Sequence, residues 1–248
     1  MSGRAAVLPR AWFPPVLEHS DHPTCTAAVV TAMAGYHLRR RTGLAWTPSV
    51  LFNYFTSRAV GKHGLLRGSR LDWAFAAWHR FGLPSEEDWP FDRSRIDQIP
   101  SKASFLRAKA FRGIGYRRLD DHDSKRGDLL GEIRGVVSQG APVSLEFPLN
   151  PAQQSSWESS LLPMLPRGAE RFARHVVLVV GYEDDTPAGV DPDTGEELTG
   201  ALIVRNSWGT DWGDGGYGRL PYQYCRKGLT RHHWTVELSP VRAERKER

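Results

Sequence analysis

The chain has 248 residues, of which 40% are hydrophobic and 25% charged, and its formal net charge is +5. These are values of an ordinary globular protein, and the length allows one large domain or two small lobes. Two cysteines are too few for a disulfide framework, and no stretch has the roughly 18 apolar residues of a membrane span. The basic clusters, at residues 39–41, 117–118 and 242–248, contain no recognisable nucleic-acid motif. We therefore expect a soluble, cytoplasmic protein without a membrane or specific nucleic-acid partner.

The first half of the chain predicts helices. Residues 1–24 are expected to be extended because several prolines disfavour the helical region for their neighbours. A helix is predicted from Thr24-Cys25 to the arginines at 39–41, since small and apolar residues recur there at three- and four-residue spacing. Two more are predicted over residues 48–57 and 70–80, the second ending at Gly82. This pattern places Cys25 in the first turn of a largely buried helix.

The second half of the chain predicts mainly strands. After a helix over about 127–138, short runs rich in Val, Leu and Ile are bounded by glycine or acidic turns. The predicted strands cover residues 142–147, 176–182, 201–205, 216–220 and 234–238. A helical half that meets a sheet-rich half indicates an α+β fold with a cleft between its lobes.

Three residues in separate segments form a candidate catalytic group. A helix N-terminus offers partial positive charge and free N–H groups to the Cys25 sulfur, although a buried structural cysteine is the alternative without a histidine partner. His175 opens one apolar strand, and Asn206 closes the next. If the two strands pair, the Asn206 oxygen can accept from one imidazole nitrogen and leave the other for the sulfur. Trp208 could cover that hydrogen bond and exclude water.

The segments that carry these residues resemble the papain-like cysteine peptidases. Cys25 followed by Thr-Ala-Ala, the Val-rich strand from His175 to Gly-Tyr, and the run Asn-Ser-Trp-Gly from Asn206 carry the likeness, which spans about residues 12–238. The closer likeness is to bacterial members, and we expect a member without a pro-region. The resemblance implies a papain-like two-lobe α+β fold. Its helical lobe spans about 24–105, its antiparallel sheet or barrel lobe about 106–238 plus an N-terminal strand, and residues 239–248 form a basic tail.

The resemblance also implies roles for individual residues. Cys25 becomes the nucleophile, His175 the base, and Asn206 the residue that orients this base. Gly68 and Ser69 match the segment whose backbone pairs with an extended peptide, with an ordinary turn as the alternative. Arg174 matches a residue lining the pocket for the second residue before the scissile bond, where a cation would favour an acidic or polar side chain.

His19 marks a departure from the family pattern. The family has a glutamine six residues before its nucleophile, whose amide donates a hydrogen bond to the oxyanion. His19 stands at this position here, and its imidazole N–H could replace the amide, with a simple loop histidine as the alternative. The Cys25 N–H would supply the second donor.

Other polar residues predict neither a metal nor a cofactor. The acidic loop over residues 183–200 lacks the full ligand pattern of a calcium loop and is predicted to be a solvated hairpin. The adjacent His232 and His233 would face opposite sides of a strand and are predicted to be structural. Cys225 has no evident partner.

The sequence therefore predicts a cysteine endopeptidase that cleaves peptide or protein substrates through a thioester, with a regulatory protein as a possible partner. Two alternatives stay open. The same three residues could catalyse acyl transfer in the maturation of a peptide, or the cleft could bind a peptide without catalysis. The sequence does not reveal the substrate, the cleavage preference, the restraint on activity or the oligomeric state.

Overall fold

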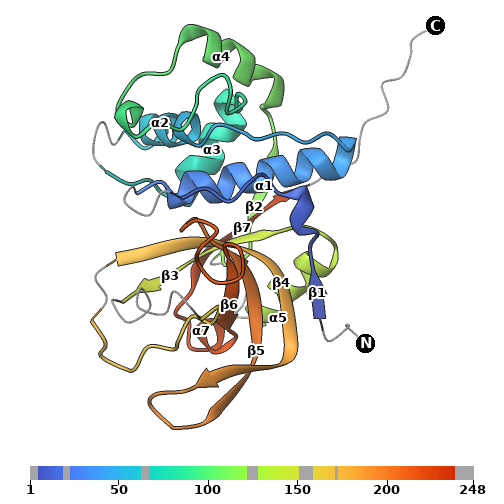
Figure 1. Ribbon diagram of the computed structural model, residues 1–248, viewed down its shortest axis with the longest axis vertical. Helices are drawn as coiled ribbons and strands as arrows, with labels where there is room; N and C mark the ends of the chain where they lie inside the picture. The colour runs from blue at the N-terminus through green and yellow to red at the C-terminus, as the bar shows by residue number, and fades with distance from the viewer. Residues whose placement is uncertain are drawn as a thin grey trace, which may run out of the picture.

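The computed structural model describes residues 5–18, 23–62, 67–121, 128–150, 159–170 and 173–237. Figure 1 shows a lobe of helices above a lobe built around an antiparallel sheet, with α1 (Cys25–Thr42) along the boundary between them. This arrangement confirms the predicted α+β, two-lobe fold. The predicted basic tail at residues 239–248 lies outside the described residues.

Helix α1 is buried on all sides along most of its length. Every residue from 26 to 37 is buried, because α1 packs against helices of its own lobe and against the sheet of the other. The helix ends at Gly43, whose φ of 75° is the left-handed conformation that favours glycine. A helix buried this completely holds its first residue, Cys25, in a fixed position between the lobes.

The other helices of the upper lobe begin and end at recognisable signals. The Ser49 side chain accepts the N–H of Phe52 at the start of α2, and Gly82 ends α3 with a φ of 80°. A side chain at Gly82 would place its Cβ 1.8 Å from the carbonyl oxygen of Ala108, so only glycine fits there. These helices are α2 (Val50–Val60), α3 (Leu71–Phe81) and the unpredicted α4 (Lys102–Ala108), with short 3-10 turns at Arg10–Trp12, Arg93–Arg95 and Lys109–Phe111.

The lower lobe contains a sheet of seven described strands, all paired antiparallel. The strand order is β2-β7-β3-β4-β5-β6, and β1 pairs with β4. The described strands form an open sheet with β2 and β6 at its ends, so the sequence-based alternative of a barrel is not what they adopt. The strands are β1 (Ala5–Val7), β2 (Gly115–Arg118), β3 (Val143–Leu149), β4 (Ala173–Val190), β5 (Glu197–Arg205), β6 (Tyr217–Pro221) and β7 (Arg231–Glu237).

Two helices complete this lobe. Helix α5 (Leu129–Ser138) packs on the sheet through Ile133 and Val137, which are both almost fully buried. The short α7 (Gln223–Arg226) follows β6. None of the described helices is long and apolar enough to cross a membrane.

Strands β4 and β5 form a long hairpin over the acidic residues 183–200, where the sequence predicted a hairpin. Their pairing continues to Val190 and Glu197. The Asp191 carboxylate near the tip is buried and lies 2.7 Å from Nζ of Lys227, just after α7. The ion pair of Asp191 therefore anchors the hairpin. Within the described ranges, no three His, Cys, Asp or Glu side chains form a group that could hold a metal ion.

Candidate active site

Cys25 is the first residue of α1, so its sulfur lies beside backbone N–H groups that the helix itself does not use. Burial raises the pKa of the Cys25 thiol, whereas the N–H groups of Val176, Thr26 and Cys25 itself act in the opposite direction. The carboxylate of Glu146 also raises this pKa. Burial is the largest of these effects, so the resting thiol is predicted to keep its proton.

The N–H of Val176 joins the two lobes at this point. Val176 lies directly after His175 on β4, and its N–H is near enough to the Cys25 sulfur to lower the pKa of the thiol. Figure 1 shows the first turn of α1 and the start of β4 on the same side of the molecule, where the lobes meet. The structure therefore brings the segments that carry Cys25 and His175 together, although they are 150 residues apart in the sequence.

His175 is held by a hydrogen bond from the neighbouring strand. Its Nε2 lies 2.7 Å from Oδ1 of Asn206, and the N–H of Ser207 donates to the same oxygen over 2.8 Å. Because this oxygen is an acceptor in both bonds, Nε2 must carry the proton. The neutral imidazole then has its lone pair on Nδ1, the form that a general base requires.

Aromatic rings enclose the imidazole. The Trp208 ring stacks on His175 with centroids 4.6 Å apart and an interplanar angle of 24°, and the edge of Phe147 approaches from 5.9 Å. Both His175 and Asn206 are buried. Burial lowers the pKa of His175 to about 4, while the bond to Asn206 opposes this shift. The Trp208 ring therefore lies against the His175 ring, and its expected role of covering the bond to Asn206 stays a prediction.

The carboxylate of Glu146, which acts on Cys25, is paired with two arginines. Oε1 of Glu146 is 3.2 Å from a guanidinium nitrogen of Arg174 and 3.9 Å from Nε of Arg231. Arg174 is thus paired with a carboxylate rather than extended into solvent. Glu146 was not predicted from the sequence, where its only signal is a single charge within the apolar strand Val143–Leu149.

Gly68 and Ser69 are held by hydroxyl groups of α2. The Gly68 N–H donates to the Tyr54 hydroxyl over 3.0 Å, and the Ser69 hydroxyl donates to Ser57 over 2.7 Å. Gly68 has a φ of 92°, and a Cβ there would meet no atom within 4 Å. These bonds anchor the segment to α2 rather than to Cys25 or His175, so its role in binding a peptide stays a prediction.

His19 lies outside the described residues, and its expected role at the oxyanion stays a prediction as well. The last described residue before it, Glu18, forms a bridge with Trp208. The N–H of Gly209 also donates to the carbonyl oxygen of Leu17 over 3.2 Å. The backbone just before His19 is therefore bonded to the backbone at Trp208 and Gly209, and the Trp208 ring covers His175.

A two-lobe α+β fold with a cysteine at a helix N-terminus, beside a histidine bonded to an asparagine, defines a cysteine peptidase scaffold. The model of the papain family cysteine proteases matches residues 62–233, a range that contains His175 and Asn206 and begins after Cys25. The chain belongs to this family, and this membership supports cysteine peptidase activity.

Relatives and solved structures agree with this assignment. The chain is 23% identical over 233 residues to an uncharacterised peptidase C1-like protein of Acanthamoeba polyphaga mimivirus, covering 90% of this chain and 71% of that protein. It is 26% identical over 211 residues to cathepsin K of Gallus gallus, covering 84% of this chain but only 55% of cathepsin K. The fold is similar to that of xylellain, a cysteine protease of Xylella fastidiosa, with a TM-score of 0.78, 20% identity, and coverage of 97% of this chain and 88% of xylellain.

Proposed function

We propose that this chain is a cysteine endopeptidase in which Cys25 is the nucleophile, His175 the base and Asn206 the residue that orients the base. The observation that carries the proposal is the hydrogen bond between His175 and Asn206, next to a backbone N–H that acts on the Cys25 thiol. The Val176 N–H lowers the pKa of the Cys25 thiol, and the neighbouring His175 donates from Nε2 to Asn206 over 2.7 Å. Together they orient the unprotonated nitrogen of the imidazole for proton transfer from the thiol.

The reaction follows from these positions. The thiol proton moves to Nδ1 of His175 as the sulfur attacks the carbonyl carbon of the scissile bond. The N–H of Cys25 stabilises the oxyanion, with His19 proposed as a second donor. The C–N bond then breaks, the leaving amine takes the proton from His175, and a thioester remains on Cys25. Water adds to the thioester with His175 again as the base, releasing the acid and the free thiol.

Substrate binding involves the charged residues beside Cys25 in this proposal. Gly68 and Ser69 would pair with the peptide backbone, and Arg174 would contact a substrate side chain. Because Glu146 offsets the Arg174 charge, a polar side chain is favoured over a strongly acidic one. A regulatory protein partner and a cytoplasmic location stay predictions from the sequence.

The proposal is tested by digesting a peptide library with the wild-type protein and with Cys25→Ala. Wild type should cleave peptides and Cys25→Ala should not. Absence of cleavage by the folded wild-type protein, or equal cleavage by both, would refute the proposal. Digestion in ¹⁸O-labelled water adds a second readout, because hydrolysis incorporates solvent oxygen whereas acyl transfer joins a new amine.

A thiol-directed epoxide gives a separate test of the nucleophile. It should label Cys25, because the proposed base His175 can take the proton of this thiol, and leave Cys225 unmodified, because burial raises the pKa of Cys225 to about 11 and the proposal places no base beside it. The Cys225→Ala variant is the matched control and should be labelled and active like the wild type. A folded protein in which Cys25 resists the epoxide would instead favour a peptide-binding module without catalysis.

A further inference from the structure

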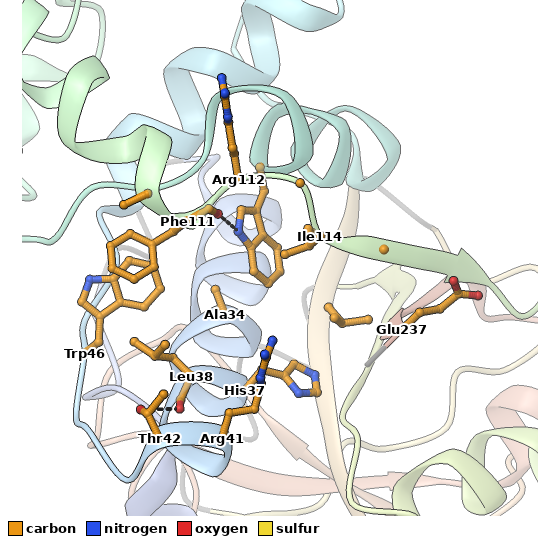
Figure 2. Close-up of a pocket in the computed structure, with 15 residues that line it drawn as sticks. Ala34, His37, Leu38, Arg41, Thr42, Trp46, Phe111, Arg112, Ile114 and Glu237 are labelled. Carbon is orange, nitrogen blue, oxygen red and sulfur yellow. Dashed lines mark hydrogen bonds between the residues drawn. The ribbon is translucent and has the colours of Figure 1, made fainter. Parts of the chain in front are cut away.

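Arg205, the last residue of β5, is a buried charge without an acidic partner among the described residues. It is 5% exposed, and burial lowers the pKa of its guanidinium, yet an arginine keeps its charge inside a protein. His37, beside the cavity in Figure 2, is different because burial lowers its pKa to about 3 and leaves the ring neutral. The charge of Arg205 therefore needs specific contacts that offset the cost of its burial.

The guanidinium of Arg205 binds the N-terminal segment of the chain. Its Nη2 donates to the carbonyl oxygens of Pro14 and Pro15 over 2.8 Å and 2.7 Å. Its central carbon lies 5.9 Å from the centroid of the Phe13 ring. Hydrogen bonds from a charged donor are roughly twice as strong as those between neutral groups. Arg205 therefore attaches three successive residues, 13–15, to the sheet.

Residues 14–16 lack backbone hydrogen bonds of their own. Proline has no N–H to donate, and in the described part of the chain no backbone–backbone hydrogen bond involves residues 14–16. The next bond along the segment runs from the N–H of Gly209 to the carbonyl oxygen of Leu17 over 3.2 Å. The polar attachment of this stretch to the sheet thus depends on Arg205.

The sheet holds Arg205 itself in a fixed position. In the strand register, Arg205 lies opposite Leu178 on β4 and Tyr217 on β6. The next residue, Asn206, donates its N–H to the carbonyl oxygen of Gly216 over 2.9 Å. The end of β5 therefore carries both the proposed orienting residue and the anchor of the N-terminal segment.

The anchored segment leads to the tryptophan that stacks on His175. Glu18 forms a bridge with Trp208, and a Cβ at Gly209 would lie only 2.8 Å from Cγ of Glu18, so the two stretches are in close contact. Trp208 is buried, and its ring centroid lies 4.6 Å from that of the imidazole. A shift of the segment would therefore be passed on to this ring and would let water reach His175.

We propose that Arg205 is a positioning residue for His175. By holding the two prolines, Arg205 keeps the segment against Trp208, and the Trp208 ring then keeps water from the imidazole. This inference rests on the proposed function, in which His175 is the base for Cys25.

The pKa of His175 reports how well its ring is covered. Burial lowers this pKa, and the bond to Asn206 opposes the shift. The Cys25 thiol titrates as part of the same pair. The charged side chains around the pair remain in place in Arg205 variants; they are Glu146 with Arg174 and Arg231, and Glu18 with Arg93. Loss of the cover should thus raise the pKa of His175.

Alkylation of Cys25 by iodoacetamide measures this pKa without peptide cleavage. In a Cys225→Ala parent, the rate should fall only below about pH 4, where His175 takes a second proton. In Arg205→Met the fall should begin about one to two pH units higher, toward the ordinary histidine value of about 6.5. The rate at pH 5 relative to pH 7 should then drop about two- to tenfold. Arg205→Lys keeps a charged donor and should shift less.

The failure of this inference differs from the failure of the proposed function. A folded Arg205→Met protein whose rate falls at the same pH as that of the parent would overturn the inference alone. A parent whose alkylation rate rises with pH like that of an isolated thiol, without a plateau, would instead refute the proposed pair of Cys25 and His175.

A second background tests the route through Trp208. In Trp208→Ala the cover is already absent, so Arg205→Met should cause no further shift, whereas a direct effect of the lost charge would persist. Equal shifts with and without Trp208 would overturn the proposal. Trp208→Leu takes the place of Trp208→Ala if circular dichroism shows that the alanine variant is unfolded.

Arg58→Met is the matched control, because Arg58 is also buried and donates to the backbone carbonyl of Ile96 over 2.8 Å, within the helical lobe. It should leave the pH dependence of alkylation unchanged even if its Tm falls. A shift as large as that of Arg205→Met would mean that the rate follows general stability, and would overturn the positioning role.

Discussion

His175 and Asn206 are joined by one hydrogen bond of 2.7 Å, and the accepting oxygen is itself held by the N–H of Ser207. His175 lies on β4 and Asn206 directly follows the neighbouring strand β5, so the sheet fixes their separation before any substrate binds. The second bond identifies the asparagine oxygen and thereby the tautomer of the imidazole. One backbone N–H thus determines which nitrogen of His175 is free to act as a base.

Replacing Asn206 with alanine should lower kcat/KM about 10²-fold, because the imidazole would lose the bond that fixes its orientation and tautomer. Circular dichroism would establish that the variant is folded. Ser207→Ala is the matched control, since it keeps the N–H that holds the asparagine oxygen, and it should stay within about threefold of wild type. Wild-type kcat/KM in a folded Asn206→Ala protein would contradict the orienting role.

The pH dependence of kcat/KM should show a plateau extending to unusually low pH. Catalysis requires the pair of Cys25 and His175 to share one proton, and a second proton on His175 removes the base. Because burial lowers the pKa of His175 to about 4, activity should fall tenfold per pH unit only below about pH 4. The fall in kcat/KM on the alkaline side should occur at a higher pH than for an ordinary thiol, since burial raises the pKa of the Cys25 thiol. An acid limb near the ordinary histidine pKa of about 6.5 would contradict this assignment.

The ion pair between Glu146 and Arg174 makes a prediction about substrate preference. In Arg174→Gln, Glu146 would keep, among the described residues, only the more distant Arg231 as an ion-pair partner, so the surroundings of Glu146 would become more negative. Peptide-library cleavage should then shift by about three- to tenfold toward basic side chains at the second position before the scissile bond. Arg117→Gln, which breaks an exposed ion pair with Glu132, should leave the profile unchanged. An unchanged profile for Arg174→Gln would exclude Arg174 from substrate recognition.

The sequence predicted the long helices and the core strands because their apolar spacing is regular and glycines mark their ends. Helix α4 buries only the small residues Ser104 and Ala108, and none of the four residues of β2 is fully buried, so neither element shows a recognisable apolar pattern. These short elements were therefore missed. At His232 the backbone has a φ of 58°, so the regular alternation expected around His232 and His233 is interrupted. Both of their N–H groups donate to the Asp120 carboxylate, a contact across 112 residues or more that no local pattern reveals.

The proximity of His175 and Asn206 could be predicted because both are polar residues at the ends of apolar strands that follow each other in the sequence. Glu146 could not be placed in the same way. Its neighbours Arg174 and Arg231 come from strands on either side of β3, and that pairing is established only by the complete sheet order. Local sequence patterns can thus predict contacts between side chains on strands that follow each other in the sequence. Contacts between charges on strands that are distant in the sequence can be predicted only when the order of the strands in the sheet is known.

Glu86 predicts a pH dependence of stability that is separate from activity. Burial raises the pKa of Glu86 to about 7, although the N–H groups of Phe91 and Val50 donate to its carboxylate and oppose the shift. One carboxylate oxygen is buried and has no partner among the described residues. The folded state therefore binds a proton that the unfolded state, with a pKa near 4.3, releases. The contribution of this proton to the free energy of unfolding is fully present below about pH 4 and is lost as the pH rises toward 7.

Glu86→Gln removes this titration and keeps an oxygen that accepts the N–H of Phe91. At pH 8 its Tm should exceed that of wild type by about 2–4 °C, corresponding to roughly 1 kcal/mol, and at pH 5 the difference should be small. Calorimetric scans at both pH values measure the change. Glu87→Gln alters the exposed neighbouring residue and should give a difference that does not depend on pH. A lower Tm for Glu86→Gln than for wild type at pH 8 would mean that the buried carboxylate is stabilised as an anion, contrary to the direction argued from its burial.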